Sequence, residues 1–465
     1  MSDQRPLVLD VDGTFLRTDM LFECFWAGLG KDPLGVLRTT LTHFGNRQVL
    51  KQKLAEYAEL RVDLLPVNQA VKDYARAAQD EGREVVLASA SDKSLVEPLA
   101  KEHGLSERVF ASTPEVNLKG DKKAAALVAA YGEGGFDYAG NEHVDRKVWD
   151  HAHTAVVVGD VAADVKAMKS AGKEVVELPG DWQAKDLFRA IRPHQWVKNV
   201  LLFVPLIAAH AFDLMSWVWV LLGMAAFSAA ASSIYLINDL LDLEADRLHK
   251  TKHKRPFASG TVPIKIGMLA FVVLSAFALG IAAFLGPAFV LTILLYMLLS
   301  LAYSLRFKRL RWIDIAVLAS LYTLRVIAGA HAVDVHVSGF LLAFIFPTFL
   351  SLGCVKRLTE VTLATNDERL PGRGYGRLDR GDLLNVAILC ALGAIFVFVL
   401  YSFSPQGIAL YKTQWLMWLA SIPLMFWMIR MVRLGYSGKQ DYDPIVFAMR
   451  DKFGLGLLML MLSIM

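Results

Sequence analysis

The feature that most constrains this chain is a series of long apolar runs that begins near residue 190. The runs lie near residues 200–215, 217–237, 266–284, 287–304, 312–331, 338–354, 384–402, 415–431 and 453–465. Most of them approach a length of about 20 residues, which a helix needs to cross a bilayer. Because a backbone in lipid must satisfy its own hydrogen bonds, helices are the expected form. Residues 189–465 are therefore predicted to form an all-α, polytopic membrane bundle of about nine transmembrane helices.

The first 188 residues differ in character from the membrane half. The chain is 55% hydrophobic, but the excess is concentrated in the later runs, and residues 1–188 are long enough to bury a globular core. The net charge of +4, without a basic motif interleaved with aromatic residues, indicates no nucleic-acid partner. Three scattered cysteines fit a reduced compartment. The polar start predicts no signal peptide.

The connections between the apolar runs carry their positive charge alternately. Basic residues fill three of them: Arg306, Lys308, Arg309 and Arg311; Lys356, Arg357, Arg369, Arg373, Arg377 and Arg380; and Arg433, Lys439, Arg450 and Lys452. The alternate connections 332–338 and 402–413 carry almost none. By the positive-inside rule the basic loops are expected to be cytoplasmic, together with the N-terminal domain.

A row of carboxylates lies where the run 217–237 gives way to basic residues. Asp239, Asp242 and Asp246 are three and then four residues apart, which places them on one face of a helix. Carboxylates that close repel one another unless a cation compensates, although an acidic helix end is often only solvated. Oxygens of this kind bind Mg²⁺, which can hold a diphosphate. We expect Asn238, Asp239, Asp242 and Asp246 to bind metal, and Asp239 and Asp242 to be catalytic.

A second pair of carboxylates opens the chain. Within Pro6–Phe15 a short apolar strand delivers Asp10 and Asp12 to a glycine turn, at the sheet edge where α/β folds bind ligands. The segment resembles the signature of the haloacid dehalogenase (HAD) phosphohydrolases. The resemblance implies an α/β fold, bound Mg²⁺, Asp10 as the phosphoryl-accepting nucleophile and Asp12 as the general acid/base. It also implies that Ser89 binds the phosphoryl group and that Lys119 steadies it.

The acidic metal motif of the HAD family has two candidates in this chain. Asn141 and Asp145 are preferred because they lie about one helix and one strand beyond the lysine. Asn141 stands where the family usually has Asp, but an amide oxygen can still bind metal. The alternative is Asp160 with Asp164. Residues 16–80 read as mostly helical, and the resemblance implies that they form a cap over the site.

The membrane half resembles the UbiA-type polyprenyl transferase superfamily. The block Asn-Asp-x-x-Asp-x-x-x-Asp at 238–246 and the segment Lys254-Arg255-Pro256 carry the resemblance, which covers about residues 190–465. The branch of decaprenyl-phosphate phosphoribosyltransferases is the most similar, on Arg192-Pro-x-Gln195-Trp196-x-Lys198-Asn199, Tyr303, Asp314-Ile315, Tyr322-x-x-Leu-Arg325 and Lys356-Arg357-x-x-Glu360. The resemblance implies substrate contacts from Arg192, Gln195, Lys198, Asn199, Lys254, Arg255, Tyr303, Arg325, Lys356 and Glu360.

The chain departs from aromatic prenyltransferases, which carry a second Asp-rich motif. Here the corresponding loop offers only Glu360, Asp367, Glu368 and Asp379 among arginines. The difference favours Mg²⁺-dependent transfer of 5-phosphoribose from phosphoribosyl pyrophosphate to a polyprenyl phosphate. The expected location is a bacterial inner membrane, with both sites on the cytoplasmic side. Prenyl transfer to an aromatic acceptor is the alternative, and a non-enzymatic scaffold or transporter is a third hypothesis. The fused HAD domain is expected to remove the 5-phosphate of the product.

Overall fold

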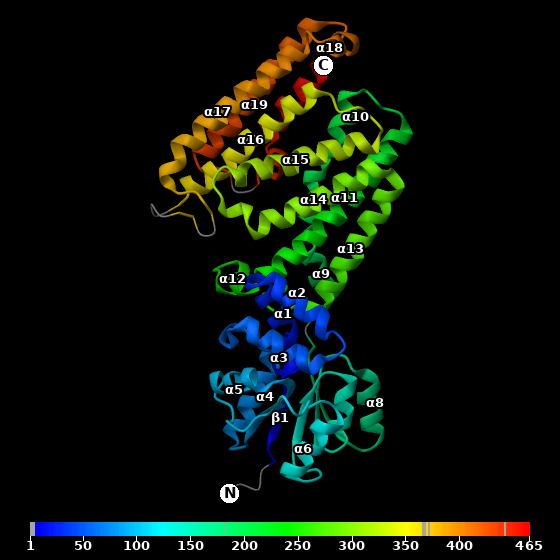
Figure 1. Cartoon of the computed structure of the whole chain (residues 1–465), viewed down its shortest axis with the longest axis vertical. Coiled ribbons are helices and arrows are strands. Elements are labelled where there is room, and N and C mark those ends of the chain that lie inside the picture. Colours follow the sequence, from blue (N-terminus) through cyan, green and yellow to red (C-terminus); the bar gives the residue numbers. More distant parts are fainter. Residues whose placement is uncertain (1–4, 181, 365–368, 371–372, 441–442) are drawn as a thin grey trace. The chain divides into compact units, whose positions relative to one another are not determined.

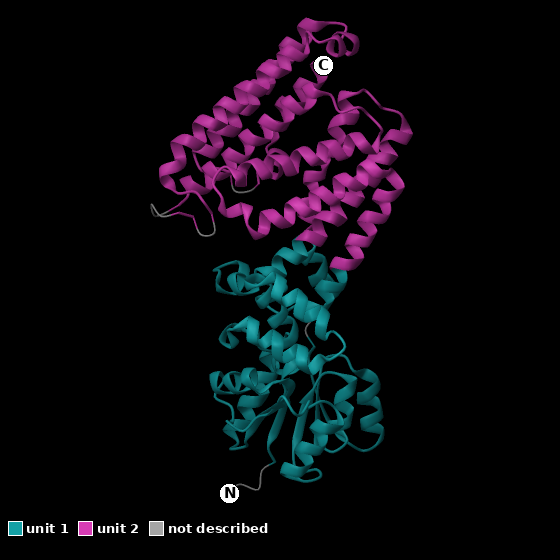
Figure 2. Cartoon of the chain, in the orientation of Figure 1, with its two compact units in different colours: residues 1–191, 235–270 teal, residues 192–234, 271–465 magenta. Residues whose placement is uncertain are grey.

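The computed structural model describes residues 5–180, 182–364, 369–370, 373–440 and 443–465. The chain divides into two compact units, which Figure 2 shows in different colours. Unit 1 comprises residues 1–191 and 235–270, and unit 2 comprises residues 192–234 and 271–465.

A six-stranded parallel sheet forms the centre of unit 1. Its order is β3-β2-β1-β4-β5-β6. The strands are β1 (Leu7–Asp10), β2 (Val85–Asp92), β3 (Phe110–Ser112), β4 (Asp137–Gly140), β5 (Thr154–Val158) and β6 (Glu174–Leu178). In the central strand, Leu7, Val8 and Leu9 have no exposed surface, as expected for a parallel sheet that is covered on both faces. The predicted N-terminal α/β domain is therefore confirmed.

Helices cover both faces of this sheet (Figure 1). On one face, α4 (Gln69–Asp80) and α5 (Lys93–Glu102) pack against Leu7 and Leu9. On the other face, α6 (Asp121–Tyr131), α7 (Arg146–Trp149) and α8 (Ala162–Ser170) pack around Val8. Neighbouring residues of β1 thus serve opposite cores, which is the two-residue period of a strand. After β6, α9 (Ala184–Ala190) leads to the membrane half.

Three helices between β1 and β2 form a separate layer, here called the helical insertion (residues 20–58). They are α1 (Met20–Lys31), α2 (Pro33–His43) and α3 (Arg47–Ala58). They share a small core of Cys24, Val36, Leu50, Leu54 and Ala58. The insertion is shorter than the expected cap of residues 16–80, because α4 contributes Val71, Ala75 and Ala78 to the core of the sheet instead.

Residues 235–270 belong to unit 1, although the sequence places them in the membrane half. They comprise the end of α11 (Leu214–Leu241), then α12 (Leu243–Leu248) and the start of α13 (Ile264–Leu285). Helix α12 packs against α1. Arg247 of α12 donates to both carboxylate oxygens of Glu23 in α1, at 2.6 and 3.0 Å, and both side chains are almost inaccessible to solvent. The segment is thereby fastened to the helical insertion.

Unit 2 is all-α, with α15 (Ile313–Ala332) and α16 (Gly339–Thr362) in its interior. The other elements are most of α11 and α13, the 3-10 helices η4 (Pro193–Phe203), η6 (Phe307–Arg309) and η7 (Arg377–Asp379), and the helices α10 (Val204–Ala208), α14 (Pro287–Leu305), α17 (Arg380–Tyr401), α18 (Pro405–Leu410), α19 (Gln414–Tyr436), α20 (Pro444–Ala448) and α21 (Lys452–Ile464). Of the 18 most apolar consecutive residues of α15, 78% are buried, whereas for α14 the share is only 22%. Helix α14 therefore presents apolar side chains to its surroundings, as a lipid-facing helix does.

Seven helices in the described parts of the chain are long and apolar enough to cross a membrane, namely α11, α13, α14, α15, α16, α17 and α19. The expected number of about nine is not reached. The run near 200–215 forms η4 and the short α10, and the run 453–465 forms α21, which has 13 residues. A helix of that length rises about 20 Å, less than the apolar thickness of about 30 Å. The prediction of a multi-pass helical membrane region is confirmed.

Candidate active sites

The first candidate site lies at the carboxyl ends of the central strands of unit 1. Asp10 ends β1, and Asp12 follows in a turn whose Gly13 has φ of +75°, a conformation that favours glycine. The Asp12 carboxylate accepts hydrogen bonds from the hydroxyls of Ser89, at 3.3 Å, and Ser91, at 2.8 Å. The sheet thus brings Asp10, Asp12 and Ser89 together. Ser91 was not singled out from the sequence, although it follows Ser89 with the same orientation along β2.

The lysine beside Asp10 is Lys123, not Lys119. Lys123 lies in the first turn of α6 and donates from Nζ to Asp10 Oδ1 at 2.6 Å and to the Tyr138 hydroxyl at 3.0 Å. Lys119 precedes α6 and is exposed. The prediction erred because several lysines surround this helix start. The signal that separates them is the buried Leu127, which lies one helical turn after Lys123 and marks its face as the inner one.

Asn141 and Asp145 lie beside this site, whereas Asp164 does not. The amide oxygen of Asn141 accepts from Thr14 Oγ1 at 3.1 Å. Asp145 Oδ1 accepts from the Tyr138 hydroxyl, and its Oδ2 accepts the backbone N–H of Asn141, each at 3.0 Å. Asp164 instead pairs with His143. The difference follows from topology, because Asn141 follows β4, the neighbour of β1, while Asp160 and Asp164 follow β5, one strand further out.

Electrostatics make Asp10 unusual. The pKa of its carboxyl is raised to about 7: burial raises it most, Lys123 lowers it, and Asp145 and Asp12 raise it. A positive charge that binds beside Asp10, such as a metal ion, would lower the pKa of its carboxyl and favour the ionised form. Oxygen donors from three loops, gathered around one lysine, have the chemistry of a phosphate and Mg²⁺ site.

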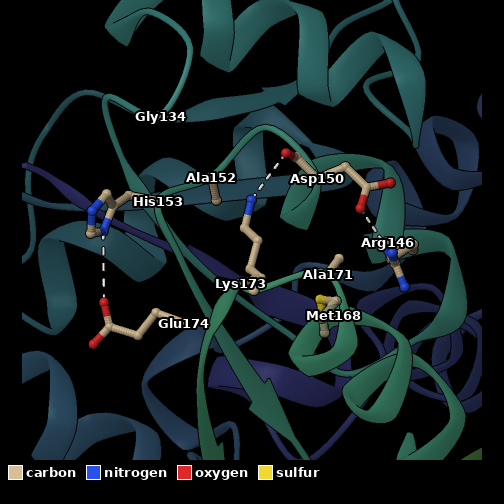
Figure 3. A pocket seen from close by; sticks show the side chains of 10 residues that line it. Gly134, Arg146, Asp150, Ala152, His153, Met168, Ala171, Lys173 and Glu174 are labelled. Atoms are coloured by element: carbon tan, nitrogen blue, oxygen red, sulfur yellow. Dashed lines mark hydrogen bonds and ion pairs between the residues drawn. The ribbon is translucent and has the colours of Figure 1, made fainter.

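A pocket of about 570 Å³ lies elsewhere in unit 1 (Figure 3). Its lining includes Gly134, His153 and Lys173, which precede β4, β5 and β6, so it sits at the amino ends of the strands. Lys173 Nζ donates to the Asp150 backbone oxygen at 3.0 Å, as Figure 3 shows. Parallel sheets bind ligands at the opposite edge, and none of the predicted site residues lines this pocket.

The second candidate site is the acidic segment of unit 1. Helix α11 ends at Leu241, and Asp242, with φ of −100° and ψ of 14°, separates it from α12. The expected single helix is therefore interrupted. The Asp242 N–H still donates to the Asn238 backbone oxygen, and the Asp246 N–H donates to the Asp242 backbone oxygen. Asp239 and Asp246 consequently share a side, where Arg255 Nη1 contacts Asp239 Oδ1 at 3.1 Å and Asp246 Oδ2 at 2.6 Å.

The acidic segment has the donor chemistry of a Mg²⁺ site. Within the described residues, no three His, Cys, Asp or Glu side chains lie close enough to enclose an ion, and Arg255 provides the positive charge between two of the carboxylates. Burial raises the pKa of Asp246, and Arg255 lowers it. The Asn238 Oδ1 atom is buried and accepts no hydrogen bond from any described residue. A buried acceptor of that kind needs a partner, and hard oxygen donors suit Mg²⁺.

In unit 2, two predicted substrate contacts converge on a carboxylate that the sequence analysis missed. Lys198 Nζ donates to Asp443 Oδ2 at 2.8 Å, and Lys356 Nζ lies 3.4 Å from the same atom. The Tyr322 hydroxyl donates to Asp443 at 2.6 Å. Burial raises the pKa of the Asp443 carboxyl, but the two lysines together hold it well below its usual range. The available signal was an Asp immediately before the proline that begins α20.

Asn199 and Arg325 form a second buried group. Arg325 donates from Nε to Asn199 Oδ1 at 3.0 Å and from Nη2 to the Tyr296 hydroxyl at 3.1 Å. Its guanidinium also lies over the rings of Phe227, at 5.2 Å, and Tyr322, at 5.6 Å. The structure therefore surrounds the Arg325 guanidinium with hydrogen-bond and ring partners from within unit 2.

Tyr303 and Glu360 belong to a third group, around the buried ion pair of Arg357 Nε with Asp314 Oδ2 at 2.5 Å. The Tyr303 hydroxyl donates to Asp314 Oδ1 at 2.8 Å, and Glu360 pairs with Arg357. Arg373 Nη1 lies 3.3 Å from Asp314 as well. Charge inside a membrane bundle is expensive and calls for partners, which this group provides internally.

The remaining predicted contacts are dispersed. Arg192, with φ of +53°, and Gln195 are half-buried at the start of η4, and Lys254 is exposed in unit 1. Asp367 and Glu368 lie outside the described residues.

Comparison with known proteins identifies the membrane half. A profile of the UbiA prenyltransferase family matches residues 200–450, which include the acidic segment and the buried groups around Asp443 and Arg357. The chain belongs to the UbiA prenyltransferase family. Residues 1–188 precede the region that the family profile matches.

Relatives of this UbiA-family protein differ in how much of the chain they match. The uncharacterized protein y4nM of Sinorhizobium fredii is 34% identical over 96% of this chain and 88% of its own length. Decaprenyl-phosphate phosphoribosyltransferase of Mycobacterium tuberculosis is 32% identical over 60% of this chain and 93% of its own length. A UbiA homologue from Archaeoglobus fulgidus bound to GPP and Mg²⁺ is 16% identical, with a TM-score of 0.47, over 60% of this chain and 97% of that one.

Proposed function

We propose that this UbiA-family protein transfers 5-phosphoribose from phosphoribosyl pyrophosphate to a polyprenyl phosphate and releases pyrophosphate. The observation that carries the proposal is the acidic segment, where Arg255 contacts the Asp239 and Asp246 carboxylates and the buried side-chain oxygen of Asn238 accepts no hydrogen bond from a described residue. Similarity to relatives named decaprenyl-phosphate phosphoribosyltransferase supports the choice of substrates.

The transfer breaks the bond between ribose C1 and the diphosphate, and forms a bond between C1 and a phosphate oxygen of the lipid. The nucleophile is already ionised near neutral pH, so no strong general base is required. Negative charge develops on the departing diphosphate, and groups that stabilise it more in the transition state than in the ground state accelerate the reaction. Mg²⁺ held by Asn238, Asp239, Asp242 and Asp246 would supply positive charge there, and Arg255 would contact the diphosphate instead of the carboxylates.

Lys198 and Lys356 are the proposed contacts for a substrate phosphate, either that of the lipid or the 5-phosphate of the ribose. Both face the Asp443 carboxylate, which is the kind of anion that a phosphate group can replace. Without substrate, the Asp443 carboxylate offsets the repulsion between the buried Lys198 and the half-buried Lys356 ammonium groups. Arg325 is proposed to position Asn199, and Tyr303 and Glu360 to orient the helix that carries Lys356.

We propose in addition that the α/β fold of unit 1 is a HAD-type phosphatase that removes the 5-phosphate of the lipid product. Asp10 would attack phosphorus, Asp12 would give a proton to the departing 5′-oxygen, and water would then release phosphate from Asp10. Ser89 and Lys123 are the proposed phosphoryl contacts. Mg²⁺ at Asp10, Asp12 and Asn141 would neutralise phosphate charge, while Asp145 orients the loop that carries Asn141.

We propose a bacterial inner membrane as the location, with both active sites on the cytoplasmic face. The charge bias of the loops and the membership of 235–270 in unit 1 support a common side for both sites.

The transferase proposal is tested with radiolabelled phosphoribosyl pyrophosphate, a polyprenyl phosphate and membranes that contain the protein. The label is expected in the lipid fraction with Mg²⁺ present, and the Asp242→Asn variant is expected to lose it. Glu244→Gln is the matched control, because Glu244 is exposed in the same segment. If prenyl diphosphate is consumed while no lipid is labelled, the chain is a prenyltransferase and the proposal is wrong.

The phosphatase proposal is tested with the same label. The Asp10→Asn variant is expected to accumulate the 5-phosphorylated lipid, whereas the wild type and the control Asp160→Asn convert it to the dephosphorylated form. Equal accumulation by the wild type would exclude this role for unit 1.

A further inference from the structure

The helical insertion carries an exposed apolar face. On α2, the exposed fractions are 81% for Leu34, 46% for Leu37, 80% for Leu41 and 77% for Phe44, which continues the helix by one residue. Their spacings of three, four and three residues place all four on one side of the helix. Four large apolar side chains on three turns form a contiguous patch, and such patches mark interaction sites.

The opposite side of α2 is packed against the rest of the helical insertion. Val36 is fully buried in the core of the insertion, and α1 and α3 both pack against α2. The helix therefore has two apolar sides, one of which fixes it in unit 1. The side with Leu34 and Leu41 is available to something outside unit 1.

The location of α2 within unit 1 indicates what covers this face. Unit 1 contains the end of α11 and the start of α13. Each of these two helices, taken whole, is long and apolar enough to span a membrane. Helix α2 packs on α1, and α1 packs on α12, directly after α11. Packed helices lie about 8–10 Å apart, so α2 lies within about 20 Å of α12. Figure 1 shows α2 at the end of unit 1 that also holds α12 and the start of α13.

The charges around the apolar face match a membrane surface. Arg38, one residue after Leu37, and Arg47, just beyond Phe44, are exposed. Lys250 and Lys254, in the segment that joins α12 to α13, are exposed as well. Basic residues beside an apolar helical face are typical of helices that lie in the headgroup region of anionic bilayers.

We propose that α2 lies in the membrane interface, with Leu34, Leu37, Leu41 and Phe44 inserted among lipid acyl chains and the basic residues among anionic headgroups. The occupant of this face is thus the lipid surface of the membrane that α11 and α13 cross. The insertion begins beside the Asp10 site, because the Met20 N–H at the start of α1 donates to Asp12 Oδ1 at 2.8 Å, so an insertion held at the bilayer surface keeps this site near the lipid. If unit 1 has the proposed phosphatase function, on which this consequence rests, its substrate is a phosphate monoester anchored in lipid.

The inference is tested on the full chain in lipid nanodiscs with one third anionic lipid. A nitroxide is attached at Leu41→Cys, and its exposure to oxygen, which concentrates in lipid, is compared with that to a water-soluble nickel chelate. Lys166→Cys on α8 is the matched control, because Lys166 is exposed on a helix of the sheet. Cys390→Ser serves as the parent, since Cys24 and Cys354 are buried. The Leu41 label is expected to favour oxygen, and the Lys166 label the chelate.

Two results would overturn the proposal. The first is equal chelate exposure of the two labels in discs. The second is protection of the Leu41 label only in discs that hold two chains, with dipolar broadening, which would make a second copy the occupant. As a further readout, Leu41→Asp is expected to slow dephosphorylation of a lipid-anchored phosphate at least tenfold while leaving a soluble phosphate ester unaffected. Because the nitroxide measurement needs no activity, failure of the phosphatase proposal leaves it interpretable.

Discussion

Removing one partner of the Glu23–Arg247 pair tests whether the acidic segment depends on the helical insertion. The pair is bidentate and buried, with side chains only 2% and 7% exposed. Loss of one member of such a pair typically costs about 3–5 kcal/mol. When Arg247 is replaced, Glu23 keeps the hydrogen bond that Thr18 donates to it at 2.7 Å. When Glu23 is replaced, Arg247 keeps the bond from its Nε to the Ala258 backbone oxygen at 3.1 Å. Because these bonds leave part of the compensation in place, we expect about 3 kcal/mol for Glu23→Gln or Arg247→Met.

The assay is hydrogen–deuterium exchange of the full chain in nanodiscs. A loss of about 3 kcal/mol corresponds to roughly 100-fold faster exchange of amides that open with the contact between α1 and α12. Amides of β1 serve as the internal reference. The matched control is Glu56→Gln, because the Lys53–Glu56 pair is exposed and such pairs contribute less than about 1 kcal/mol. The reasoning is refuted if both single variants change exchange in α1 and α12 by less than tenfold.

Three further predictions concern the sites. Asp443→Asn leaves Lys198 and Lys356 without their carboxylate, so the thermal midpoint of unfolding should fall. Added phosphoribosyl pyrophosphate should raise this midpoint more in the variant than in the wild type. An unchanged midpoint in the variant would contradict the contact. Burial raises the pKa of Asp10 from 3.8 to about 7, so between these values the folded state holds a proton that the unfolded state has released. The free energy of unfolding therefore declines as the pH rises from 4 to 7, by about 1.4 kcal/mol per pH unit. Asp10→Asn should therefore gain stability relative to the wild type over that range in metal-free unfolding titrations, and parallel curves would refute it. Asn238→Ala should raise the Mg²⁺ concentration for half-maximal transfer at least about tenfold, whereas an unchanged requirement would remove Asn238 from the metal site.

The sequence predicted the elements whose residues carry their own pattern. Apolar runs of about 20 residues identify the spanning helices, because crossing a bilayer depends on length and composition alone. The run 453–465 misled because its composition is apolar while its helix has only 13 residues. The segment 235–270 was assigned to the membrane half, whereas in unit 1 it contacts residues far away in the sequence, such as Glu23, which pairs with Arg247 more than two hundred residues later. No local pattern encodes such a contact.

The candidate sites followed the same rule. Asp10, Asp12 and Asn141 were found because strand ends of a parallel sheet meet at one edge. Lys123 was missed because the register of α6 decides which lysine faces inward. Asp443 was missed because its role depends on Lys198 and Lys356, which come from η4 and α16. Arg325 was read as a phosphate contact because a charge in an apolar helix attracts that interpretation, whereas the structure surrounds it with internal partners.

The ion pair of Arg247 with Glu23 limits where this chain can be cut into two separately folded parts. A cut at the boundary near residue 191 would separate two sequence regions but not two self-sufficient proteins, because α12 would lose the surface that buries its arginine. The mycobacterial relative matches only 60% of this chain while using 93% of its own length, so it has no room for a counterpart of the whole N-terminal region. A version of the membrane half that is used without residues 1–191 would therefore require Arg247 and its neighbours to be redesigned together.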